Sequence, residues 1–117
     1  MKGEQSMNNQ NEIGSVIARI QRMEIYYNAL RNAMLYAPDT IEEDDLIRGM
    51  LRRLTEYYDS RQWLDDYHAD EQGRLPEGLR RGVLSEDGVY NLLSDIEEYY
   101  SEKDSDDVYE DSADKSI

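Results

Sequence analysis

The feature that most constrains this fold is a run of apolar residues that recur at alternating steps of three and four positions between residues 13 and 34. This spacing places every member on one face of an α-helix and is the seam pattern of coiled coils. The pattern predicts a helix over residues 12–36, whose apolar stripe must be buried against another part of the chain or against a second copy. The stripe consists of Ile13, Val16, Ile20, Met23, Tyr27, Leu30 and Met34.

A second amphipathic helix is predicted over residues 41–58, after a break at Pro38. Proline disfavours helical backbone at the residue before it, so the first helix should end near Tyr36. Thr40 and Glu43 have the spacing of a capping box, in which each side chain bonds the backbone of the other residue. The short connection between the two helices favours an antiparallel hairpin.

The clearest helix start in the chain is at Ser85. Ser85 is predicted to cap the third long helix, residues 86–100, because serine is a favoured N-cap residue. Leu84 and Val89 hold the two positions of a hydrophobic staple, which fixes the angle at which the chain enters a helix. The third helix is therefore predicted to pack by its apolar face against the first two.

Shorter elements and the two ends complete the predicted architecture. Two short helices are predicted between the second and third long helices, over residues 61–68 and 76–81. Residues 1–11 lack apolar periodicity and residues 101–117 are acidic with little apolar content, so both segments are predicted to be disordered. The sequence thus predicts one all-α domain, residues 12–100, a small bundle of three amphipathic helices with two short ones.

A resemblance to a known family rests on two segments, RIQRMEIYYNAL and YYDSRQWLDDYHADEQGRLPEGLRRGVLSEDGVYNLL. Its most specific features are the pair Tyr57-Tyr58, the acids that follow Trp63, and the run from Arg81 to Asp87. Over residues 17–100 the chain resembles a family of short bacterial proteins catalogued as a domain of unknown function. The resemblance implies a helical domain of bacterial or phage-like origin, and it implies no activity.

The net charge of −14 argues against two classes of partner. Proteins bind nucleic acids through lysine and arginine, which release the counterions condensed on phosphate, and anionic membranes attract the same cations. We therefore expect no direct nucleic-acid contact and no membrane contact. The chain has no cysteine, no apolar run long enough to span a bilayer, and no signal-type apolar segment at its start. These features favour a cytoplasmic protein.

The sequence predicts no catalytic residues, no metal site and no cofactor. The acids near His68 could offer oxygen ligands to Ca²⁺ or Mg²⁺, but the spacing counted from Asp66 fails as an EF-hand because its sixth position is Glu71 instead of glycine. Asp65, Asp66, Asp70 and Glu71 are therefore interpreted as solvated acids at a helix end. The chain contains no glycine-rich phosphate loop, nucleophile elbow or HExxH motif, so it is predicted not to be an enzyme.

An aromatic set around Trp63 is the candidate binding surface, because tyrosine and tryptophan dominate the hot spots of protein interfaces. The set consists of Tyr57, Tyr58, Trp63, Tyr67 and Tyr90. The alternative is that these side chains build the core, and this alternative is favoured for Trp63 and Leu64. Arg80 and Arg81 are expected to form ion pairs with the nearby acids. The candidate partner-binding residues are Tyr58, Trp63, Tyr67, Asp70, Glu71, Arg80 and Arg81.

Two functional hypotheses remain open at this point. The leading one is a non-enzymatic module for protein–protein interaction, with a protein partner still to be identified. The alternative is an acidic decoy that imitates a nucleic-acid backbone and blocks the basic groove of a DNA- or RNA-binding protein. The seam of residues 13–34 also allows a homodimer, because its pattern does not distinguish pairing within a chain from pairing between copies.

Overall fold

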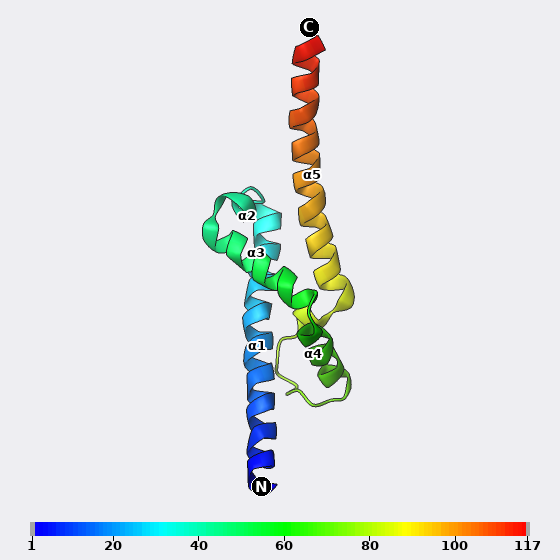
Figure 1. Cartoon of the computed structure of the whole chain (residues 1–117). Helices are drawn as coiled ribbons and strands as arrows, with labels where there is room; N and C mark the ends of the chain where they lie inside the picture. The colour runs from blue at the N-terminus through cyan, green and yellow to red at the C-terminus, as the bar shows by residue number, and fades with distance from the viewer. Residues whose placement is uncertain (1, 117) are drawn as a thin grey trace.

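The fold is all-α, as the sequence predicts. The computed structural model describes the backbone of residues 2–116 and the side chains of residues 12–103. None of the residues in the described backbone forms a strand. Within the same range, no helix combines the length and the apolar character needed to cross a membrane. In chain order the elements are α1 (Lys2–Tyr36), α2 (Thr40–Glu43), α3 (Asp45–Tyr58), α4 (Arg61–Glu71), the 3₁₀ helix η1 (Gly82–Leu84) and α5 (Glu86–Ser116) (Figure 1).

Helix α1 is the element on which the others pack. Helix α3 returns along α1 in the opposite direction, so the predicted antiparallel hairpin is present (Figure 1). Helix α5 runs in the same direction as α1: Gly88 in its first turn lies against Tyr27, and the Tyr100 hydroxyl donates to the Pro38 carbonyl at 2.8 Å. Both α3 and α5 pack against α1, and they hardly contact each other.

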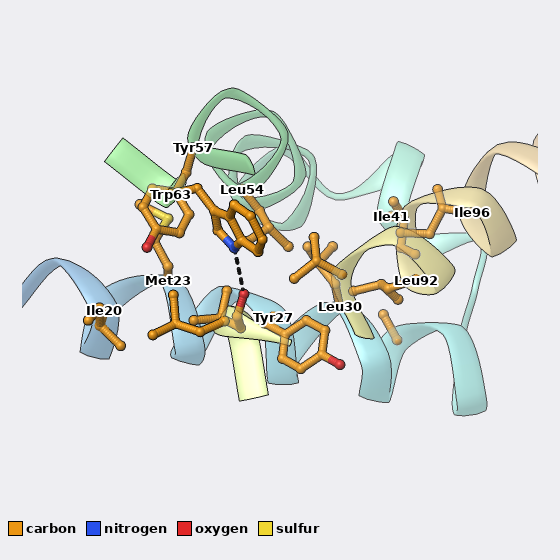
Figure 2. Packing of buried hydrophobic residues seen from close by; sticks show 14 of the residues in the cluster. Ile20, Met23, Tyr27, Leu30, Ile41, Leu54, Tyr57, Trp63, Leu92 and Ile96 are labelled. Atoms are coloured by element: carbon orange, nitrogen blue, oxygen red, sulfur yellow. Dashed lines mark hydrogen bonds between the residues drawn. The ribbon is translucent and has the colours of Figure 1, made fainter. Parts of the chain in front are cut away.

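The predicted seam of α1 is buried inside the chain. Its central residues, from Ile20 to Leu30, lie in the core beneath Leu54 of α3 and Leu92 of α5 (Figure 2). Ile41 of α2 and Ile96 of α5 close the core at the end where α1 meets α2. The central part of the seam is therefore used for packing within the chain, while Ile13, Val16 and Met34 are half-buried.

Two buried side chains of helix α4, Asp66 and Trp63, make polar contacts with other elements. Its Asp66 carboxylate accepts hydrogen bonds from Arg19 of α1 and from the Tyr57 hydroxyl at the end of α3. Its Trp63 indole N–H donates to the Val83 carbonyl of η1 at 2.9 Å (Figure 2). Trp63 is buried, as favoured from the sequence. The hydrogen bond to Val83 satisfies the indole N–H, which would otherwise be buried without a partner.

The predicted helix 41–58 is interrupted at Asp44. The backbone of Asp44 is extended, and its side chain accepts from the amides of Leu46 and Ile47, which makes it the N-cap of α3. The capping box expected at Thr40 is not formed, because the Thr40 hydroxyl donates to the Ala37 carbonyl instead. A short acidic side chain that can bond the backbone two and three residues ahead favours ending one helix and starting another.

The segment between α4 and α5 also differs from the prediction. Residues 76–81 form a turn and an irregular stretch, and the helical residues are those of η1, from Gly82 to Leu84. The Arg81 guanidinium binds the Pro76 and Leu79 carbonyls, and this holds the segment in a loop. Helix α4 continues three residues past the predicted end at His68.

The start of α5 follows the prediction. The Ser85 hydroxyl accepts the Gly88 amide at 3.2 Å, and the staple residues Leu84 and Val89 are both buried. Two other predictions are wrong: Leu64 is 42% exposed instead of lying in the core, and Asp66 is fully buried instead of solvated.

The predicted disorder of residues 1–11 and 101–117 stays a prediction. The bounds of α1 and α5 include most of these residues, while the side chains of residues 1–11 and 104–117 lie outside the described part of the chain.

Candidate functional site

A groove of about 540 Å³ lies between α3 and α5. The groove exists because the two helices pack against α1 but not against each other. The side chains along it are mainly apolar or aromatic, and the buried Ile96 forms part of its floor. The α3 side is formed by Leu51, Thr55, Tyr58 and Asp59, and the α5 side by Tyr90, Leu93, Ser94, Glu97, Tyr100 and Ser101.

Tyr90 is the most exposed aromatic side chain of the groove. It is 61% exposed, although it sits one residue after the fully buried Val89 on the same helix. A tyrosine ring in this position keeps a large apolar surface in contact with water, and such rings are typical anchors at protein interfaces. Leu51, Tyr58 and Leu93 are half-buried and extend the apolar surface on both walls.

Negative charge surrounds one end of the groove. Burial raises the pKa of Tyr58, and the nearby carboxylates of Glu86, Asp59 and Asp87 raise it further. An acidic environment disfavours the phenolate, which explains the direction of the second effect. Asp59 and Glu97 are themselves part of the groove lining. The surface therefore combines apolar contact area with an anionic border.

Of the five aromatic residues named from the sequence, Tyr58, Trp63 and Tyr67 form a row, and one end of this row reaches the groove. Trp63 lies edge-on to Tyr58 at 5.1 Å between ring centroids and stacks on Tyr67 at 5.3 Å. Trp63 is buried and its indole N–H is bonded to the backbone, so its role is structural. Glu71, followed by Glu86, raises the pKa of the Tyr67 hydroxyl. Of the row, Tyr58 is the member that lines the groove.

The charged candidates Asp70, Glu71, Arg80 and Arg81 lie away from the groove lining. Arg81 pairs with Asp70, as expected, and holds the loop before η1 through the Pro76 and Leu79 carbonyls. Arg80 is exposed and lines a separate hollow beside Glu24 of α1. These residues are not brought together into one site.

The described side chains contain no metal-binding arrangement: among residues 12–103, no three His, Asp or Glu residues are grouped so that they could hold an ion. Asp66, the first position of the tested loop pattern, is instead occupied by Arg19 and Tyr57.

The family is decided by a match over residues 20–102 to DUF4298, described as a domain of unknown function. The chain belongs to DUF4298. The resemblance noted from the sequence is thereby confirmed, and the residues that line the groove, from Leu51 to Ser101, all lie inside the matched part of this DUF4298 domain. Comparison with curated proteins finds no match, and comparison with solved structures finds none either.

Most groove residues of this DUF4298 domain were missed by the sequence analysis, which named only Tyr58 and Tyr90 among them. A signal was present in α5, where Tyr90 and Leu93 follow the buried Val89 and Leu92 one position later. An apolar stripe this wide exceeds what one packing face needs and indicates a second apolar contact. On α3 the signal is ambiguous, because Leu51 and Tyr58 fit the stripe that packs on α1 equally well.

Proposed function

We propose that this chain is a non-enzymatic module that binds a protein partner through the groove between α3 and α5. The observation that carries the proposal is the exposed Tyr90 beside the half-buried Leu93 and Tyr58, on a concave surface that the described chain leaves uncovered. Burying apolar surface of this kind under a partner lowers the free energy of the complex, and tyrosine is enriched at the hot spots of such interfaces.

The chemistry of the groove lining supports binding over nucleophilic catalysis. Its hydroxyl groups come from Thr55, Ser94 and Ser101, and activating such a hydroxyl requires an adjacent base. The described lining contains neither histidine nor lysine, and its two carboxylates, Asp59 just after α3 and Glu97 of α5, stand on opposite walls. Apolar contact with an anionic border is the property that the surface offers.

The test is site-specific photo-crosslinking in cells of the source organism. Tyr90 is replaced by a photoreactive phenylalanine derivative, and Tyr36, an 83% exposed tyrosine at the end of α1, is replaced in a matched control. We expect a protein adduct of defined mass from position 90 and none of that mass from position 36. The same adducts from both positions, or none from position 90, would contradict the proposal.

An acidic decoy for a nucleic-acid-binding protein is the second proposal, and the charge of α5 supports it. Between residues 86 and 103 this helix carries six acids and one lysine. A decoy would bind mainly through charge, so its affinity should fall steeply with salt and should survive loss of the Tyr90 ring. A groove-binding module requires that ring, so Tyr90→Ala separates the two functions.

A further inference from the structure

The dimensions of the groove match a short helix. Its α3 wall extends from Leu51 to Asp59 and its α5 wall from Tyr90 to Ser101. At a rise of about 1.5 Å per residue these walls are about 12 Å and about 16 Å long, which corresponds to between two and three turns of an α-helix. A helix laid between two helices with its apolar face inward is a recurring mode of peptide recognition.

Each wall contributes one carboxylate to the lining, but the two helices that form the walls differ in net charge. Helix α5 carries six acids and one lysine between residues 86 and 103, while α3 carries three arginines and two acids between residues 45 and 58. Glu97 belongs to the lining on the α5 side, and Asp59 lies at the end of the α3 side. The negative field also reaches the Tyr58 hydroxyl, since Glu86, Asp59 and Asp87 raise its pKa in addition to burial. The groove should therefore bind an occupant most strongly when the occupant carries cationic side chains along the edge that faces α5.

We infer that the groove takes an amphipathic α-helix of a partner protein, two to three turns long, with an apolar stripe on Tyr90 and Leu93 and with lysine or arginine along the edge that faces α5. This inference rests on the proposed function and names the class of partner. A second copy of this chain is disfavoured as the occupant, because two molecules of charge −14 repel each other at close range.

The test uses a designed peptide helix of about eleven residues, which is about three turns, with a leucine stripe and lysines on one edge, and a control peptide in which glutamates replace the lysines. Binding to the full chain is measured by fluorescence anisotropy at physiological ionic strength. We expect the lysine peptide to bind at least about tenfold more tightly than the glutamate peptide, because like charges across an interface are strongly disfavoured.

Matched variants show whether the groove is responsible. Tyr90→Ala should weaken the lysine peptide by about tenfold or more, and Leu35→Ala, at a 71% exposed leucine outside the groove lining, should leave it unchanged. Glu97→Lys should weaken binding more than Glu98→Lys, because Glu97 lines the groove and its neighbour does not, and charge effects fade over about 8 Å in physiological salt.

Each other result overturns the inference in a distinguishable way. If the glutamate peptide binds equally well, the occupant is not cationic. If Tyr90→Ala leaves the lysine peptide unchanged, binding is by charge alone and the decoy is favoured. If neither peptide binds but position 90 crosslinks a protein in cells, the docking function stands and this class of occupant is wrong. If position 90 crosslinks to a second copy of the chain, the groove is a homodimer interface.

Discussion

The carboxylate of Asp66 on α4 accepts two hydrogen bonds from the guanidinium of Arg19 on α1, 47 residues earlier in the chain. The Nε–Oδ2 distance is 2.9 Å and the Nη2–Oδ1 distance is 2.5 Å. The Tyr57 hydroxyl donates to the same Oδ2 atom at 2.6 Å. Asp66 is fully buried, and three donors satisfy its charge. This cluster joins α1, the end of α3 and α4, and it thereby fixes where Trp63 and Tyr58 lie.

Removing the Asp66 carboxylate should destabilise the fold strongly. Asp66→Ala leaves the partly buried Arg19 guanidinium and the Tyr57 hydroxyl without their partner. The free energy of unfolding should fall by about 3 kcal/mol, the low end of the range for buried ion pairs, because Arg19 keeps some contact with water. The matched control is Asp65→Ala, since Asp65 is exposed and pairs only with exposed Arg61, so its loss should cost less than about 1 kcal/mol. Urea unfolding followed by Trp63 fluorescence measures both; equal losses would show that the cluster is not a stabilising contact.

The Tyr57 hydroxyl should make the chain sensitive to alkali. Burial, followed by the hydrogen bond to Asp66, raises the pKa of Tyr57 far above its ordinary value near 10. The folded state therefore keeps a proton that the unfolded state releases above about pH 10, so the free energy of unfolding falls as pH rises. In Tyr57→Phe the free energy of unfolding should fall less steeply with pH, because unfolding then releases up to one proton fewer. Unfolding measured between pH 9 and pH 11 checks it, and equal slopes in both proteins would contradict it.

Glu24 should stabilise η1 from α1. Its Oε1 atom accepts the Val83 amide at 2.8 Å, and Val83 is fully buried. Glu24→Ala leaves this amide without its acceptor, which should cost about 1–3 kcal/mol, while Glu24→Gln keeps an acceptor oxygen and should cost less. Hydrogen exchange of the Val83 amide should accelerate in the alanine variant. Unchanged exchange there would mean that another group or water replaces the contact.

Two glycines should respond to alanine in opposite directions. Gly49 lies inside α3 with open space where a Cβ would stand, so Gly49→Ala should raise stability by about 1 kcal/mol through helix propensity. At Gly88 a Cβ would stand 2.6 Å from the Tyr27 hydroxyl oxygen, and the buried Tyr27 ring must move. Gly88→Ala should therefore lower stability by about 1–2 kcal/mol, as overpacked sites do.

A double variant identifies the cause at Gly88. Tyr27→Phe removes the oxygen that the new methyl group would meet, so Gly88→Ala should cost less in that background than in the natural chain. Thermal unfolding of the four proteins measures the difference. An equal cost in both backgrounds would place the strain elsewhere, for example at Ser85, whose Cβ lies 3.3 Å from the same position.

Features that depend on neighbouring residues were predictable. The helix of the seam, the antiparallel return of α3 and the cap at Ser85 all follow from spacing and from residue types within one or two turns. The ion pair of Arg81 with Asp70 was also expected, because a short loop separates the two residues. The interruption at Asp44 was missed because an aspartate inside an apolar periodicity can continue a helix or cap a new one, and here it caps α3 through the Leu46 and Ile47 amides.

Features that depend on which helices meet were not predictable. Asp65 and Asp66 are adjacent identical residues, yet one is exposed and the other is fully buried, because only Asp66 points toward Arg19 and Tyr57. Leu64 was predicted to be buried and is exposed, because the face of α4 that meets the bundle carries Trp63 and Asp66 instead. The groove likewise depends on the angles at which α3 and α5 pack against α1.

The sequence by itself determined that this chain forms amphipathic helices, that α4 begins at Arg61 and α5 at Glu86, and that its charge is strongly negative, because these properties follow from residue types and short-range spacing. Tertiary structure alone decided that Asp66 is buried and paired with Arg19, and that the Tyr90 ring of α5 is left uncovered. The physical reason is that burial and electrostatic environment are set by residues distant in the chain, and a helical periodicity states which face is apolar but not which surface will cover it.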